Sequence, residues 1–362
     1  MSGALLVLVS PDGDAMRREA FELAVTFAPE RPVLVLCPKA DLALYRAAGI
    51  PARKWRPAGY FGMTNSVKEL RRSVERHAPA LVHAHGFPAI ALALGTFPRP
   101  LARRTVVTFH EPQRAKELPR KLVDTRFAAY LSRAGAAIVT YPTLAASLGK
   151  RLGLPPETFA VIPHGVEEPD PAPLRRPEGR PGPIVGWFGS LAADRSWEIA
   201  IDGFGEIADR FPDARLHLAG TGLARQFVRA HVRQSKHANR VVFRGNVPQP
   251  ELFASIDALV VPLSGDAQPV APLAALLAGV PVIATDRGAL TDALRDARTG
   301  WLVDDDPAGF ALGIATAWGE IDAAWDAAAA DRSRAVATYG RPAVARAYAA
   351  VYDQVATAAG ES

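Results

Sequence analysis

The sequence predicts an α/β protein made of two parallel-sheet domains, and three observations support this fold class. The chain has 362 residues, which is long for one hydrophobic core and ordinary for two. Short apolar runs alternate with helical patterns, and the runs are apolar at successive positions, as in strands that are covered on both faces. A single proline-rich segment interrupts the alternation near the middle of the chain.

The first half of the chain contains six strand-like runs. Between them lie amphipathic stretches, and the clearest of these is 66–77. Ser66 with Glu69 three residues later has the pattern of a capping box, which predicts a helix that starts there. The six expected strands are Ala4–Ser10, Val33–Cys37, Leu81–His85, Thr105–His110, Ala136–Tyr141 and Phe159–Pro163.

The second half repeats the alternation after the segment 167–183. That segment has six prolines in seventeen residues and reads as an inter-domain linker between domains 1–166 and 184–340. From about residue 307 the chain is purely helical, and 341–358 has apolar residues at helical spacing, so we expect it to pack back on the first domain. The expected strands are Ile184–Phe188, Arg215–Ala219, Val241–Arg244, Ala258–Leu263, Pro281–Thr285 and Trp301–Val303.

Composition limits the class of protein. Hydrophobic residues make up 49% and charged residues 22%, and no apolar run reaches the ~18–20 residues that span a bilayer. Ala4–Ser10 follows Met-Ser-Gly without a basic region or a cleavage site, which favours a buried strand over a signal peptide. Cys37 is the only cysteine, so disulfides and thiolate metal sites are excluded and a reducing, cytoplasmic location is expected.

Charge is unevenly distributed along the chain. Residues 1–170 carry 23 Lys and Arg against 15 Asp and Glu, while the remainder carries 19 against 22. The basic residues either form solvated helix faces or attract an anionic partner, such as a phosphorylated acceptor or the acidic inner face of the plasma membrane. Nucleic acid is not expected as a partner, because aromatic residues do not interleave with the basic ones.

In open parallel sheets, ligands bind beyond the carboxyl ends of the strands. With two sheets in tandem, those ends can face one another across a cleft. One candidate site therefore gathers the loops 10–15, 85–88, 110–117, 189–196, 220–223, 245–248 and 264–271.

Seven short motifs along the chain resemble, in order, those of the retaining family-4 glycosyltransferases of GT-B fold, also called glycosyl transferases group 1. The resemblance implies two Rossmann-like domains, with the acceptor on the first and a nucleotide-sugar donor on the second. It also implies polysaccharide or glycolipid biosynthesis of a bacterial kind. The motifs are 83–86 (HAHG), 108–111 (TFHE), 161–166 (VIPHGV), 189–196 (GSLAADRS), 216–222 (LHLAGTG), 242–247 (VFRGNV) and 279–285 (GVPVIAT).

The resemblance also implies roles for the sugar-binding residues. His110 would contact donor-sugar hydroxyls near the anomeric carbon, and Asp266 would bond the transferred sugar and orient its ring. The backbone amides of Ala267, Gln268 and Val270 would face the sugar and the leaving phosphate. Each residue also has a structural alternative: His110 can simply cap its strand and bond to neighbouring backbone, and Asp266 can serve as a turn or helix-capping residue.

Further positions follow from the same resemblance. Gly189 permits backbone to approach the diphosphate, with Ser190 and Arg195 beside it. The nucleoside pocket would be lined by Gly220, Gly222, Asn246 and Val247, although glycines after strands are common in any α/β protein. On the acceptor side we place Gly13, Asp14 and His85. His85 and His164, which replaces an Asn of the family hinge, can also be purely structural.

The donor motifs depart from the family at four positions. The two Glu residues separated by seven positions correspond to Asp266 and Ala274, and an alanine cannot bond a ribose. The diphosphate Arg falls at Ser190, and the family Lys is Arg195. Loss of one cation would cost ~1–3 kcal/mol of donor binding.

The sequence thus predicts a glycosyltransferase that moves a sugar from a nucleotide-diphosphate sugar to a hydroxyl acceptor with retention. No cofactor and no metal are expected, because Asp306 before Pro307 reads as a helix cap and not as part of a metal-binding run 304–306. Two alternatives remain: a catalytically silent GT-B protein that binds a ligand or partner, and a nucleotide-sugar epimerase on the same fold.

Overall fold

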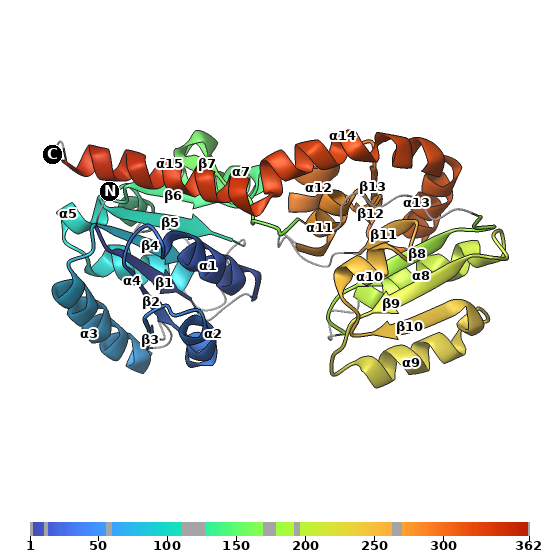
Figure 1. Ribbon diagram of the computed structural model, residues 1–362, viewed down its shortest axis with the longest axis horizontal. Coiled ribbons are helices and arrows are strands. Elements are labelled where there is room, and N and C mark those ends of the chain that lie inside the picture. The colour runs from blue at the N-terminus through green and yellow to red at the C-terminus, as the bar shows by residue number, and fades with distance from the viewer. Residues whose placement is uncertain are drawn as a thin grey trace. The chain divides into compact units, whose positions relative to one another are not determined.

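The computed structural model describes residues 3–10, 14–55, 60–110, 127–168, 179–191, 196–262 and 270–360. The chain forms two compact units: unit 1 contains residues 1–165 and 344–362, and unit 2 contains residues 166–343. Figure 1 shows a sheet flanked by helices in each unit. None of the helices in the described part of the chain combines the length and the hydropathy that crossing a bilayer requires.

Unit 1 is built on a parallel sheet with the strand order β3-β2-β1-β4-β5-β6-β7. The order reverses between β1 and β4, where the backbone N–H of Ser10 donates to the carbonyl of His85 over 3.1 Å. The strands are β1 (Leu5–Val9), β2 (Val33–Cys37), β3 (Ala52–Lys54), β4 (Leu81–His85), β5 (Thr105–Phe109), β6 (Ala136–Val139) and β7 (Phe159–Val161).

Helices connect these strands. Most central strands are buried at every residue, which explains why they read as unbroken apolar runs. The helices are α1 (Asp14–Phe27), α2 (Leu42–Ala47), α3 (Tyr60–His77), α4 (Phe87–Thr96), α5 (Arg99–Ala102) and α7 (Pro142–Leu152), with short 3₁₀ turns η1 (Lys39–Asp41) and η2 (Pro156–Thr158).

Unit 2 repeats this design with the strand order β10-β9-β8-β11-β12-β13, again all parallel. Its reversal lies between β8 and β11. The strands are β8 (Ile184–Phe188), β9 (Arg215–Ala219), β10 (Val241–Gly245), β11 (Ala258–Val261), β12 (Val282–Thr285) and β13 (Gly300–Val303).

Two hydrophobic clusters fill unit 2. One includes α8, α9 and α13 residues, and the other includes α10, α11 and α12 residues. Asp306 caps α13, because its carboxylate accepts the backbone N–H of Gly309 over 2.7 Å, as the sequence predicted. The helices are α8 (Ser196–Ala208), α9 (Arg225–Gln234), α10 (Gln249–Phe253), α11 (Val270–Ala278), α12 (Gly288–Leu294), α13 (Pro307–Gly319) and α14 (Ile321–Tyr339), with the 3₁₀ turn η3 (Ala238–Arg240).

The last helix, α15 (Arg341–Gly360), carries the chain back to unit 1 (Figure 1). Val344, Tyr348, Tyr352 and Val355 lie on one face of it and are buried in the core of unit 1. The ring of Tyr352 lies 5.1 Å from that of Phe27 in α1. A segment distant in sequence therefore completes the core of unit 1.

One predicted helix start was wrong, and one strand was not predicted. The helix expected from residue 66 begins at Tyr60, so Ser66 lies inside α3 and is not its N-cap; its carbonyl accepts the indole N–H of Trp55 over 3.0 Å. The capping pattern was a local coincidence within a longer helix. β3 was not predicted, because its three residues, Ala52–Lys54, are only partly buried and form no apolar run.

Candidate donor site and a buried histidine chain

Three loops at the carboxyl edge of the unit 2 sheet are hydrogen-bonded to one another. The N–H of Gly189, after β8, donates to Ala219 at the end of β9 over 3.1 Å, and that of Leu191 donates to Thr221 over 3.0 Å. The N–H of Gly220, after β9, donates to Gly245 at the end of β10 over 2.7 Å. These backbone groups are therefore occupied within the loops and hold the three strand ends in register.

Two glycines allow this close approach. Gly220 has φ +139°, and a Cβ built on it would lie 1.8 Å from the carbonyl oxygen of Gly189. A Cβ on Gly222 would lie 2.2 Å from the carbonyl oxygen of Leu191. Because any side chain at either position would collide with backbone, the sequence Gly-Thr-Gly is a requirement of the loop packing.

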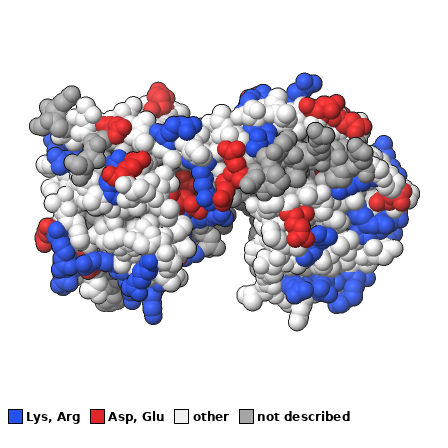
Figure 2. Space-filling model, viewed as in Figure 1, with Lys and Arg blue, Asp and Glu red and all other residues white. Residues whose placement is uncertain are grey.

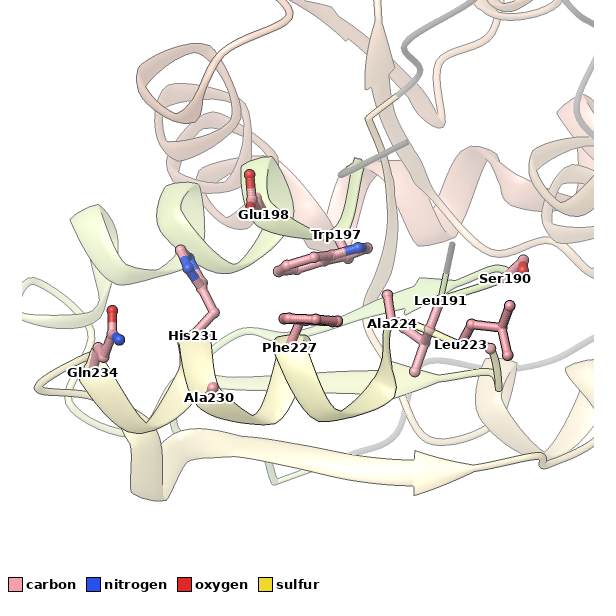
Figure 3. Close-up of a pocket in the computed structure, with 11 residues that line it drawn as sticks. Ser190, Leu191, Trp197, Glu198, Leu223, Ala224, Phe227, Ala230, His231 and Gln234 are labelled. Carbon is pink, nitrogen blue, oxygen red and sulfur yellow. The ribbon is translucent and has the colours of Figure 1, made fainter. Parts of the chain in front are cut away.

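A pocket of about 750 Å³ opens beside these loops, between α8 and α9 (Figure 3). Ser190 and Gly222, which the sequence predicted to bind the donor, are both in its lining. Trp197 of α8 and Phe227 of α9 point into the space between the two helices (Figure 3). The pocket is therefore lined by backbone and a hydroxyl group from the loops, and by an aromatic wall that consists of Trp197 and Phe227.

The rim of the pocket is charged and polar. His231 of α9 lies 2.6 Å from a carboxylate oxygen of Asp202 in α8 and packs edge-on against Trp197, with ring centroids 5.7 Å apart. Three exposed arginines repeat every fourth residue along α9, and basic side chains gather on the surface over this helix (Figure 2). They are Arg225, Arg229 and Arg233.

The other predicted donor residues of unit 2 take different environments. Asn246 is exposed after β10, while Val247 packs against a hydrophobic cluster. Val270 is the first residue of α11. Ala274 is 6% exposed and belongs to the same cluster as Val247. The methyl group at the position of the family's second Glu is thus a packing group.

Several predicted positions lie outside the described residues: Asp266, Ala267, Gln268, Arg195 and Gly13. Asp14 is the first residue of α1, and its side chain is not described.

Unit 1 places the predicted residues His85 and His110 side by side. Nδ1 of His85 lies 3.1 Å from Nε2 of His110, and Nδ1 of His110 lies 3.4 Å from Nε2 of His164. His164 in turn has Nδ1 3.5 Å from a carboxylate oxygen of Glu19 in α1. All four side chains are at least 96% buried. Both ring nitrogens of His110 are therefore within hydrogen-bonding distance of other histidines.

Burial lowers the pKa values of His85 and His110. It lowers the pKa of His85 to about 3, with His164 as a second cause. Burial also places the pKa of His110 well below its usual value, followed by the effects of His164 and His85. His83, on the same strand, has a pKa lowered by burial; its two nitrogens lie 2.6 Å from the Tyr352 hydroxyl and 2.7 Å from the Thr108 hydroxyl.

Sequence reasoning missed Glu19 and the aromatic wall of the pocket. Glu19 is separated by 146 residues from Gly165, whose N–H it accepts over 3.0 Å, so no local pattern could link them. Phe227 and His231 did carry a signal, because they are one helical turn apart just after a predicted donor loop.

Two family models match complementary parts of the chain. The model described as Glycosyltransferase Family 4 matches residues 20–168, and the model described as Glycosyl transferases group 1 matches residues 182–319. Together they match more than half of the chain. The chain belongs to the group 1, family 4 glycosyltransferases.

Curated relatives of this glycosyltransferase match over about half of its length. A 2-deoxystreptamine glucosyltransferase of Streptomyces kanamyceticus is 29% identical over 53% of the chain and 57% of the relative. A D-inositol 3-phosphate glycosyltransferase of Paenarthrobacter aurescens is 30% identical over 54% of the chain and 49% of the relative. The chain thus spans about half the length of the curated relatives it matches.

Solved structures share the fold over the whole chain. A glycosyltransferase from Rickettsia africae ESF-5 gives a TM-score of 0.79 at 15% identity and 98% coverage of both chains. Anabaena HepE in complex with UDP gives 0.78 at 18% identity, covering 98% of this chain and 100% of that one. The GT-B fold with two Rossmann-like parallel-sheet domains is therefore confirmed.

Proposed function

We propose that the protein transfers a sugar, with retention, from a nucleotide-diphosphate sugar to a hydroxyl acceptor, and that the loops after β8, β9 and β10 hold the donor. One observation carries the proposal. The loop glycines Gly220 and Gly222 lock these strand ends together, and the pocket beside them contains Ser190 and an aromatic wall. Ligands of parallel sheets bind at this edge. Membership of the family and the UDP complex of a protein with the same fold support it.

In this proposal the diphosphate lies at Ser190, with Arg195 as its remaining cation. The nucleoside extends along Gly222 towards Asn246, and Asp266 positions the sugar. His110 belongs to unit 1, where both of its ring nitrogens lie within hydrogen-bonding distance of other histidines. The amides of Gly189 and Gly220 do not take part, because they are bonded within the loops. The leaving diphosphate is stabilised by the arginine, by Ser190 and by other loop amides, since cations and N–H groups of the protein can stabilise the developing charge.

The test measures hydrolysis and transfer with UDP-, GDP-, ADP- and dTDP-sugars. Turnover with at least one donor supports the proposal. Absence of turnover together with absence of nucleotide binding contradicts it. Binding without turnover supports a catalytically silent GT-B protein, which the packing of Ala274 in the core favours.

Ser190→Arg sharpens the test. Ser190 is exposed, so a longer side chain fits, and a restored cation at a diphosphate is expected to tighten UDP binding by ~1.5–3 kcal/mol. Ser333→Arg, at an exposed position of α14, adds the same charge elsewhere in unit 2 and serves as the control. Equal effects of the two variants would place the diphosphate elsewhere.

We further propose that unit 1 meets an anionic partner through Arg99, Arg103 and Arg104, which are exposed and line a hollow of about 280 Å³ near Ala359 in α15. An acidic membrane leaflet suits three arginines on one surface. Binding to anionic phospholipid vesicles should weaken as salt rises and should fall when all three are replaced by Gln. Equal binding to neutral phosphatidylcholine vesicles would contradict this proposal.

A further inference from the structure

The histidine chain of unit 1 behaves as one hydrogen-bonded unit. The ring planes of His85 and His110 make an angle of 27°, with centroids 5.4 Å apart and Nδ1 of His85 3.1 Å from Nε2 of His110. The rings of His110 and His164 are 37° apart, with centroids 5.0 Å apart. Since a neutral imidazole has one N–H and one acceptor nitrogen, each contact needs a proton on one side only.

With all three rings neutral, this requirement leaves two arrangements for the whole chain. In the first, all three rings carry the proton on Nδ1, so that His85 donates to His110 and His110 donates to His164. In the second, all three carry it on Nε2 and every bond is reversed. A mixed arrangement would set two lone pairs or two N–H groups against each other inside the core.

The position of Glu19 determines which of the two tautomer arrangements the histidine chain adopts. Its Oε2 accepts the backbone N–H of Gly165 over 3.0 Å and lies 3.5 Å from Nδ1 of His164. A carboxylate beside Nδ1 favours the tautomer with the proton there, because the alternative directs a lone pair at a negative charge. The first arrangement follows for His164, and through it for His110 and His85.

The far end of the chain then presents a lone pair. Nε2 of His85 is fully buried and has no hydrogen-bond partner among the described residues. His85 is the last residue of β4, at the reversal point of the unit 1 sheet, which is where ligands of such sheets bind. A buried acceptor without a partner costs free energy, so a ligand that donates a hydrogen bond to this nitrogen would be stabilised.

We propose that Glu19 and His164 are positioning residues that hold His110 and His85 as Nδ1–H tautomers, which leaves Nε2 of His85 as the acceptor for a substrate hydroxyl. His85, and not His110, is then the histidine with a nitrogen available to the ligand, because both nitrogens of His110 are used in the chain. The substrate hydroxyl rests on the proposed function, whereas the tautomers do not. The low pKa of His85 means that this nitrogen stays unprotonated at neutral pH.

Nitrogen NMR of the full chain, labelled with ¹⁵N-histidine, tests the tautomers directly. Two-bond nitrogen-proton correlations separate Nδ1–H from Nε2–H rings, and the variants His85→Asn, His110→Asn and His164→Asn assign the signals. We expect all three rings to carry the proton on Nδ1. A proton on Nε2 of His85 or His110 in the unaltered protein would overturn the proposal without any need for further variants.

Two replacements of Glu19 test its role. Glu19→Gln keeps an oxygen that can accept from Gly165 and His164, so the Nδ1–H tautomers should remain. Glu19→Leu removes the acceptor, and the three rings should move towards Nε2–H. Glu22→Leu, on the same helix, is the matched control and should leave the tautomers unchanged, since Glu22 is half-buried and lies 3.8 Å from the exposed Arg18. Unchanged tautomers in Glu19→Leu would overturn the role of Glu19.

Activity separates this inference from the proposed function. Glu19→Leu should lower kcat/KM for sugar transfer by roughly 10- to 100-fold, the usual effect of losing an outer partner of a functional histidine, while Glu19→Gln should restore most of it. Equal rates in Glu19→Leu and the unaltered protein would refute the positioning role. An unaltered protein that transfers no sugar would refute the proposed function and the substrate hydroxyl, while the NMR result would still decide the tautomers.

Discussion

Gly220 lies where the loops that follow β8, β9 and β10 are held together. Its missing side chain lets the carbonyl of Gly189 approach, and its N–H reaches Gly245. The motif that contains Gly220 and Gly222 was recognised from the sequence, but the reason for the glycines was not. The structure shows contact between the loops, and the contact with a nucleoside that the motif implied stays a prediction.

Replacement of Gly220 by Ala is expected to lower the free energy of unfolding by about 3 kcal/mol or more, because the Cβ must displace backbone from a strained φ of +139°. Gly245→Ala is the control. Gly245 also has a positive φ, +70°, but its Cβ would meet nothing within 4 Å, so only about 1 kcal/mol should be lost. Urea unfolding measures both, and equal losses would contradict the loop contact.

The buried histidines predict a pH dependence of stability. Their pKa values are lowered in the folded protein, to about 3 for His85, so the unfolded chain binds more protons below pH 6.5. The free energy of unfolding should therefore be greatest above pH 6.5 and fall as pH drops towards 5, by up to about 1.4 kcal/mol per pH unit for each such histidine. Unfolding curves that coincide at pH 7 and pH 5 would contradict the buried, neutral state.

At the residue scale, the placement of polar side chains at strand ends was predictable and long-range partners were not. The sequence placed His85 and His110 at strand ends because each ends or directly follows an apolar run, and their roles stay predictions. Glu19 was not, since its partners His164 and Gly165 are reached only when the sheet has formed. Asp266 and Arg195 lie outside the described residues, and their roles stay predictions.

At the scale of elements, the apolar runs predicted the strands well, whereas the capping patterns predicted one helix start correctly and one incorrectly. The runs were reliable because parallel strands buried on both faces leave an unmistakable apolar pattern. The Asp306 cap was confirmed, while the Ser66 box fell inside α3. A capping pattern is only a few residues long, so a longer helix can run through it.

Asp306→Ala tests the cap that the structure does show. Loss of the bond from the carboxylate to the Gly309 N–H should cost about 1 kcal/mol of unfolding free energy, a value typical of N-cap replacements. Asp304→Ala, two residues earlier and exposed, removes an equal charge without removing the cap and should leave stability within about 0.5 kcal/mol. Thermal unfolding of the two variants distinguishes a cap from a simple charge effect.

At the scale of the whole molecule, α15 joins the end of the chain to the first unit. Its buried face includes Tyr348 and Tyr352, both fully enclosed in the core of unit 1. Each large apolar side chain contributes about 1.5–3 kcal/mol of burial, and a domain has only about 5–15 kcal/mol in total. Unit 1 should therefore depend on α15 for its stability.

Removal of residues 341–362 tests that dependence. Fragment 1–165 alone should lack a cooperative unfolding transition, while the same fragment joined by a flexible linker to 341–362 should regain one. Circular dichroism during heating measures both. A cooperative transition in fragment 1–165 without α15 would contradict this view of the domain.

The central claim is that the strand-end loops of unit 2 hold a nucleotide diphosphate. Calorimetric titration of the full chain with UDP-, GDP-, ADP- and dTDP-glucose tests it most directly, with Gly220→Ala in parallel at a temperature where both proteins are folded. The account predicts saturable binding of one molecule per chain for at least one of these donors, and a loss of affinity of tenfold or more in the variant. No heat with any donor, or equal affinity in the two proteins, would contradict it.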